Sequence, residues 1–192
     1  MSLEISNLKK TYDSRIVLNG INLKLENGIY LLTGSSGCGK TTLLRILSGL
    51  EKCDSGSYSY EGGVSFMFQE ARLFPWMNVL ENIEAVTRCT KKYSSDLFAE
   101  FGMKDELNKF PHELSGGMQR RVSIVRTLSR KAGLYLFDEP LAGLDAELKD
   151  TACSVIKHNL PADSTAIIVS HETSEVKKIV QGEFHLENGI IV

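Results

Sequence analysis

The sequence lacks an excess of charge of either sign. Its 22 Lys and Arg residues nearly balance 24 Asp and Glu residues, which gives a formal net charge of −2 at pH 7. Proteins that bind nucleic acid through its phosphates carry a basic surface. The composition therefore predicts no nucleic-acid partner.

Long hydrophobic runs are also missing. The apolar segments extend over a few residues each, far short of the roughly 20 that a membrane-spanning helix needs. The first residues lack the basic and apolar regions of a signal peptide. We therefore expect a cytoplasmic protein without membrane spans.

Cysteines are few, and none of the four belongs to a CxxC pair. Cys38, Cys53, Cys89 and Cys153 are predicted to be free thiols, which is typical of the reducing cytoplasm. At 192 residues with 42% hydrophobic content, the chain is long enough for one well-packed core, and we expect a single domain over residues 1–192.

What is present is a phosphate loop at residues 34–42, which fits the pattern G-x-x-x-x-G-K-[ST] at every fixed position. A predicted strand at 29–33 precedes it, and apolar residues at helical spacing follow at 42–47. Glycines and the N–H groups of a helix N-terminus can surround phosphate oxygens. We expect Lys40 to bind the β- and γ-phosphates and Thr41 to ligate Mg²⁺. A plain glycine-rich turn is the alternative.

Two carboxylates follow the predicted strand at 134–137. Ligands collect beyond the carboxyl ends of strands in open α/β sheets, and Asp138 and Glu139 lie at such an end. Carboxylates that face a triphosphate would repel it, unless a bound cation such as Mg²⁺ lies between them. Asp138 is therefore predicted to hold Mg²⁺ through its water shell, and Glu139 to act as general base on the attacking water.

Three more residues are candidates for the same pocket. Gln69 follows the predicted strand at 64–68 and could reach the metal or its water, or could cap a loop. His171 follows the strand at 166–169 and could contact the γ-phosphate, although a lone His is usually a surface or capping residue. Tyr12 could stack on adenine or be an isolated surface residue.

A second glycine turn, residues 114–119, leads into a predicted helix and forms another N-terminus suited to an anion. One nucleotide pocket does not need two such sites, so the turn at Ser115, Gly116 and Gly117 would serve a neighbouring subunit's phosphate. A Ser N-cap followed by flexible glycines is the alternative, and local physics favours it. Asp145 is likewise a predicted N-cap, for a helix at 146–159.

The remaining patterns predict an α/β fold. Alternating residues at 3–8 and 21–25 indicate an N-terminal antiparallel β subdomain, and 182–186 and 190–192 a hairpin across Asn188-Gly189. Asn78 is predicted to cap a helix at 79–86, and residues 94–96 to start another that Gly102 stops. Phe74, Trp76 and Met77 form either local core or an exposed docking patch.

In this order and spacing, the residues resemble the nucleotide-binding subunit of ATP-binding-cassette (ABC) transporters over nearly the whole chain. Residues 34–42 match Walker A, 114–117 the family signature and 134–139 Walker B. The run at 74–82 looks most like bacterial importer cassettes. Met118 departs from the commoner Gln of the signature, and the helical lobe is short for the family.

The resemblance implies a P-loop NTPase core with a mainly parallel sheet and a small inserted helical lobe, which with the signature helix covers approximately 71–130. It implies an Mg²⁺-dependent ATPase in which two cassettes pack head to tail around ATP. The second cassette is another copy or a homologue. The cycle would drive a membrane permease at the inner face of the membrane, through the Gln69 loop and the helical lobe.

The resemblance also assigns roles residue by residue. Catalytic roles fall to Glu139, His171 and Gln69, and metal binding to Thr41, Gln69 and Asp138. The A-, Q-, D- and H-loop positions are Tyr12, Gln69, Asp145 and His171. The implied nucleotide contacts are Tyr12, Gly34, Ser35, Ser36, Gly37, Cys38, Gly39, Lys40, Thr41, Thr42, Ser115, Gly116, Gly117 and Asp145.

Other functions remain open at this point. A non-transport ATPase of the same superfamily usually carries two cassettes in one chain or long inserted arms. A small-molecule kinase would have no use for residues 114–117 or for Glu139 as a base. Export rather than import is a further alternative.

Overall fold

The computed structural model describes residues 2–86 and 91–192. Within these ranges no helix is long and apolar enough to cross a membrane. Cys38, Cys53 and Cys153 are free thiols, as predicted, whereas Cys89 lies outside the described residues.

A six-stranded sheet forms the centre of the chain, in the order β5-β6-β7-β3-β8-β9. The first five strands run parallel, and β9 pairs antiparallel with β8. The strands are β5 (Val64–Met67), β6 (Leu134–Asp138), β7 (Thr165–Val169), β3 (Gly28–Thr33), β8 (Gly182–Glu187) and β9 (Ile190–Ile191). Both β6 and β7 are buried along their whole length, which explains their continuous apolar runs.

Side chains of β6 alternate between two buried clusters. Leu134 and Leu136 pack in the cluster that includes α1 (Lys40–Leu47). Tyr135 and Phe137 pack in the cluster that includes helices α4 (Gly116–Ser129) and α5 (Ala146–Asn159). Because the sheet is covered on both faces, the carboxyl ends of its strands are held at fixed positions along one edge.

The second sheet is antiparallel, in the order β2-β1-β4, with β1 (Leu3–Tyr12), β2 (Arg15–Leu25) and β4 (Ser55–Ser59). The sequence placed Tyr12 between two shorter strands, but β1 extends to Tyr12 and pairs it with Arg15. A tight turn joins the strands, in which Asp13 and Ser14 have positive φ angles of 43° and 72°. Such turns usually contain glycine, so this one gave no recognisable signal.

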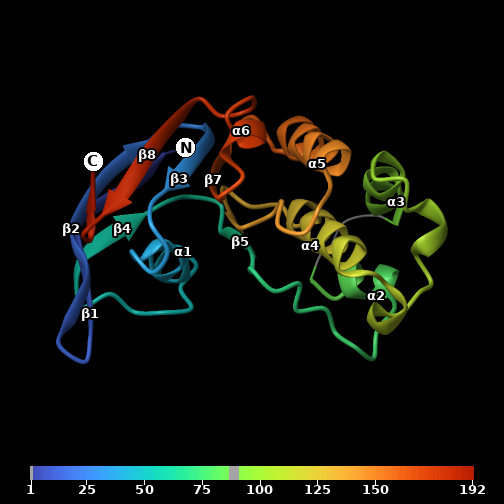
Figure 1. Cartoon of the computed structure of the whole chain (residues 1–192), viewed down its shortest axis with the longest axis horizontal. Coiled ribbons are helices and arrows are strands. Elements are labelled where there is room, and N and C mark those ends of the chain that lie inside the picture. The colour runs from blue at the N-terminus through green and yellow to red at the C-terminus, as the bar shows by residue number, and fades with distance from the viewer. Residues whose placement is uncertain (1, 87–90) are drawn as a thin grey trace.

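Helices α2 (Val79–Glu84), α3 (Lys91–Glu100) and α4 (Gly116–Ser129) gather at the end of the molecule opposite β1, β2 and β4 (Figure 1). Short 3₁₀ turns, Lys104–Glu106 and Pro111–Glu113, lie between α3 and α4. Asn78 caps α2 with a capping box, as predicted. Helix α3 begins before the predicted start at residues 94–96. Since α4 also contacts β5, it links this helical lobe to the central sheet.

The C-terminal half follows the sequence pattern closely. Helix α5 (Ala146–Asn159) has the predicted bounds, with Asp145 as its N-cap. The turn between β8 and β9 uses Asn188 and Gly189 at φ angles of 49° and 80°, as the dipeptide predicted. The four-residue helix α6 (Thr173–Val176) was not predicted, because it is too short to show a helical period.

Candidate functional site

The loop between β3 and α1 has the conformation that the phosphate-loop motif predicts. Gly34 has φ of 146°, and a Cβ there would lie 2.4 Å from the carbonyl oxygen of Leu186. Only glycine fits this position. Lys40 is buried, and its ammonium donates to the carbonyl oxygens of Gly34 and Ser35 at 2.7 and 2.9 Å. Its Nζ also lies 3.8 Å from the Sγ of Cys38. The positive charge is thus held at the mouth of the loop.

A cavity of about 340 Å³ opens beside this loop. It brings together predicted residues from five separate segments of the chain. Those that line it are Tyr12, Ser36, Gly37, Gly39, Lys40, Thr41, Thr42, Gln69, Asp138, Glu139 and His171. Gly34, Ser35 and Cys38 belong to the same loop but do not line this cavity.

Glu139 and His171 meet at the carboxyl ends of β6 and β7. Glu139 has a positive φ of 54°, which is unusual for a non-glycine residue. Its carboxylate accepts a hydrogen bond of 3.1 Å from the backbone N–H of His171 and lies 3.4 Å from the Nε2 atom. Burial raises the pKa of Glu139, and the contacts with His171 oppose that shift. A carboxylate with a raised pKa is a better proton acceptor.

Asp138 lies beside the phosphate loop and is buried. Burial raises the pKa of its carboxyl group, while the hydrogen bond with Thr41 and the charges of Arg45 and Lys40 oppose that shift. The hydroxyl of Thr41 and the carboxylate of Asp138 are thus neighbours, and both are hard oxygen donors of the kind that Mg²⁺ prefers.

The turn at Ser115 and the loop before α5 lie outside the cavity lining. The Oγ of Ser115 accepts a hydrogen bond of 3.2 Å from the N–H of Met118, and Asp145 caps α5 through the N–H of Leu148 at 2.9 Å. The local prediction of two N-caps is therefore confirmed. Ser115 and Gly116 are exposed to solvent. Within one copy of the chain, this turn does not contribute to the cavity.

Two residues at the site, Arg15 and Arg120, were not expected from the sequence. Arg15 lines the cavity, and recognising the turn at residues 13–14 would have placed it opposite Tyr12. Arg120 donates to the backbone oxygen of Gln69 and so ties α4 to the segment after β5. Burial lowers the pKa of Arg120, and the charges of Glu139 and Asp138 raise it.

Outside the cavity lining, Asn82 was also not expected from the sequence. It is fully buried and holds the aromatic loop at residues 74–77. Its Oδ1 accepts from the N–H of Phe74 at 2.7 Å. Its Nδ2 donates to the carbonyl oxygens of Phe74, Met77 and Asn78 at 3.1, 2.9 and 3.0 Å. Within this loop Trp76 remains 69% exposed. The loop is therefore built as an ordered surface feature.

Known proteins resemble this chain in sequence. The ABC transporter family matches residues 18–142. An aliphatic sulfonates import ATP-binding protein of Cupriavidus necator is 35% identical over 205 residues, covering 100% of this chain and 68% of the relative. Proteins of the same description from Agrobacterium fabrum and Paraburkholderia xenovorans are 35% and 36% identical. The Agrobacterium protein aligns with 100% of this chain and over 78% of its own length. The Paraburkholderia protein aligns with 99% of this chain and over 58% of its own length.

Solved structures share the fold. The dimeric bacterial ABC transporter cassette MJ0796 superposes with a TM-score of 0.88 at 24% identity, covering 98% of this chain and 96% of the other. An ATP-binding subunit of an ABC transporter superposes with a TM-score of 0.90 at 20% identity, covering 100% and 88%. The expected fold class is thereby confirmed. The chain belongs to the ABC transporter family and carries that family's ATP-binding, ATP-hydrolysing cassette.

Proposed function

We propose that the cavity beside residues 34–42 binds Mg²⁺-ATP and that its hydrolysis powers a membrane importer. The observation that carries this proposal is the convergence of a buried Lys40 with Asp138, Glu139 and His171 around one cavity. Each acidic residue lies at the carboxyl end of a buried parallel strand, where an α/β sheet places its ligand.

Hydrolysis requires a base that accepts a proton from the attacking water. Glu139 is suited to this role because its burial raises its pKa and the N–H of His171 fixes one carboxylate oxygen. The His171 ring, 64% exposed at the side chain, is free to contact the terminal phosphate. Lys40 exchanges carbonyl partners for phosphate oxygens. Two further residues line the pocket: Gln69 would face the attacking water, and Tyr12 would face the adenine ring of ATP.

The residues around Asp138 fit Mg²⁺. Among residues 2–86 and 91–192, no three His, Cys, Asp or Glu side chains group closely enough to hold a metal by themselves. Mg²⁺ commonly takes one or two protein ligands and completes its shell with water and substrate phosphates. Thr41, Asp138 and Gln69 would hold the ion, which supplies neutralisation of charge on the β- and γ-phosphate oxygens.

A second cassette would complete the site. Ser115, Gly116 and Gly117 lie at the N-terminus of α4, a 14-residue helix with no acidic residue in its first turn, and Ser115 and Gly116 are exposed. This is a suitable anion-binding group, yet it lies outside the cavity of its own chain. In a head-to-tail pair, it would bind the γ-phosphate held by the other cassette, with Asp145 nearby. The dimeric state of the similar cassette supports such a pair.

The permease would dock on the groove between β5 and α4. This cavity of about 300 Å³ is lined by Phe66, Phe68, Phe74, Arg72 and Arg126, among others. The guanidinium of Arg126 donates to the carbonyl oxygens of Arg72 and Ala71, which orders the segment after Gln69. An apolar helix of the permease fits this lining, and movement there would reach the nucleotide through Gln69.

The names of the relatives favour import of small organic solutes such as aliphatic sulfonates, with the cassette on the cytoplasmic face of the membrane. Membrane fractionation with and without a co-expressed permease tests this assignment. We expect the chain in the membrane fraction only when the permease is present. A Trp76→Ala variant, altered in the exposed aromatic loop, should bind the permease less well while keeping its ATP affinity. A chain that never co-purifies with a membrane protein would contradict the transport function.

A further inference from the structure

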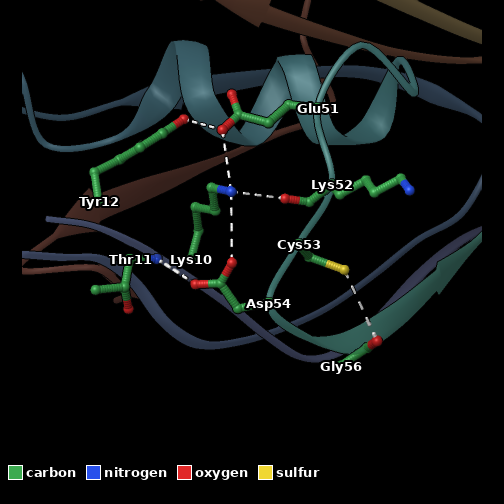
Figure 2. Close-up of polar contacts among 8 residues, drawn as sticks. All are labelled: Lys10, Thr11, Tyr12, Glu51, Lys52, Cys53, Asp54 and Gly56. Atoms are coloured by element: carbon green, nitrogen blue, oxygen red, sulfur yellow. Dashed lines mark hydrogen bonds and ion pairs between the residues drawn. The ribbon is translucent and has the colours of Figure 1, made fainter. Parts of the chain in front are cut away.

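Tyr12 lies in a polar network that no motif accounts for. Figure 2 shows two segments meeting here, the end of β1 and the chain that follows α1. The hydroxyl of Tyr12 donates to the carboxylate of Glu51. The ammonium of Lys10 lies 3.3 Å from the same carboxylate and 5.0 Å from the centre of the Tyr12 ring. One acidic residue thus contacts both the ring's hydroxyl and the cation above its face.

The network is anchored on the backbone. Lys10 donates to the carbonyl oxygen of Lys52 at 2.9 Å, and the N–H of Thr11 donates to Asp54 at 2.7 Å. The side chains of Lys10 and Glu51 are only 14% and 19% exposed, so solvent screens their attraction weakly. Burial, and next the hydrogen bond to Glu51, raise the pKa of Tyr12.

These contacts restrict the ring in two ways. The bond to Glu51 limits how the ring can turn, and Lys10 covers one of its faces. The remaining surface is substantial, because Tyr12 is 39% exposed and lines the nucleotide cavity. A planar base can therefore stack on the face opposite the ammonium, and a cation on one face of an aromatic ring is attracted to its π system.

We propose that Glu51 is a positioning residue for the base of bound ATP. It acts through Tyr12 and Lys10, by holding the ring in the orientation that stacks on adenine. The inference rests on the proposed role of Tyr12 in nucleotide binding. It also links that role to α1, because Glu51 follows the helix that carries Lys40 and Thr41.

The test compares two ligands that share the phosphates and differ in the base. Binding of Mg²⁺-ATP and of Mg²⁺-tripolyphosphate is measured by calorimetry on the full chain. Glu51→Ala should lower the affinity for Mg²⁺-ATP roughly five-fold or more, which is the order expected for loss of one base–aromatic stack. Its affinity for Mg²⁺-tripolyphosphate should stay unchanged. Glu51→Gln keeps an acceptor for the Tyr12 hydroxyl and should recover part of the loss. The matched control is Glu4→Ala, which removes an ion pair with Lys24 on the same sheet. It should change the affinity for neither ligand.

The same comparison of ligands on Tyr12→Ala distinguishes failure of the proposed base contact from failure of the proposed positioning role. If Tyr12→Ala does not lower ATP affinity relative to tripolyphosphate, the proposed base contact of Tyr12 is wrong. If it does, but Glu51→Ala does not, the positioning role alone is overturned. Equal weakening of both ligands by Glu51→Ala would also overturn it, since that result indicates a purely structural residue. In a protein that already carries Tyr12→Ala, adding Glu51→Ala should not further change the ratio of ATP affinity to tripolyphosphate affinity.

Discussion

The carboxylate of Glu139, at the end of β6, accepts a hydrogen bond from the backbone N–H of His171, beyond the end of β7. The two strands are direct neighbours in the sheet, with Asp138 opposite Val169. The position of Glu139, the proposed general base, is therefore set by strand pairing in the buried core. A flexible loop would hold the carboxylate less accurately.

Replacing Glu139 by Gln should leave ATP binding largely intact and slow hydrolysis roughly 10²–10⁴-fold, the usual contribution of a general base. Gln keeps an oxygen that can accept from the N–H of His171, so the local structure should persist. Phosphate release and ATP binding are measured separately. The variant should also accumulate as an ATP-bound dimer by size-exclusion chromatography, and a monomeric, fully active variant would contradict the assignment.

The same substitution has a predicted effect on stability. Burial raises the pKa of Glu139 in the folded protein above the ordinary value of 4.5. The contribution of Glu139 to the free energy of unfolding is therefore fully present below pH 4.5. It is lost as the pH rises through the pKa of Glu139 in the folded protein. Glu139→Gln should therefore unfold at higher urea concentration than the wild type at pH 7 without nucleotide. The difference should shrink as the pH falls toward about 4.

Substituting Ser115 by Arg should abolish hydrolysis and leave ATP binding by the isolated subunit unchanged, because the turn lies outside the cavity of its own chain. Mixing this variant with Lys40→Ala tests the pairing directly. Each variant alone should be inactive, but a mixed pair contains one intact loop facing one intact turn. Activity that stays absent in the mixture, or loss of nucleotide binding by Ser115→Arg, would argue against a shared site.

A thiol reagent should inhibit through Cys38, since its sulfur lies in the phosphate loop 3.8 Å from the ammonium of Lys40. Cys38 does not line the cavity itself, but a bulky adduct would disturb the loop that binds the phosphates, so saturating Mg²⁺-ATP should slow the reaction. Cys153 is buried with its pKa raised to about 11 and should react slowly. The Cys53→Ser variant should stay sensitive. Inhibition at the same rate with and without ATP would exclude Cys38 as the target.

Asn82 should be needed for the order of the aromatic loop. Asn82→Ala leaves the N–H and carbonyl groups of Phe74 without their partner. Because these groups are only partly buried, the loss in free energy of unfolding should not exceed the roughly 1–3 kcal/mol of a fully buried unpaired polar group. Trp76 is the only tryptophan, so its fluorescence reports on this loop. We expect an altered emission spectrum and weaker permease binding. An unchanged spectrum and unchanged stability would show that Asn82 does not hold the loop.

The sequence predicted most of the sheet core because buried parallel strands are continuous apolar runs, as at β6 and β7. It also placed Asp138, Glu139 and His171 together, because parallel strands deliver their carboxyl ends to one edge. The extent of β1 was missed, since the turn at Asp13 and Ser14 contains no glycine.

Contacts between distant segments could not be predicted. Arg120 reaches Gln69 across 51 positions, and Glu51 reaches Tyr12 across 39. Such pairs depend on how α4 packs against β5 and how the two sheets meet, and no local pattern encodes either. The roles proposed for Ser115 and Asp145 likewise require a second copy, because within one chain both residues are helix N-caps.

The most direct measurement is a structure of the Glu139→Gln variant with Mg²⁺-ATP. It should contain two copies, with Ser115 and Gly116 of one copy at the γ-phosphate that Lys40 of the other copy binds. A complex in which Ser115 faces solvent, with no second copy near the terminal phosphate, would contradict the account.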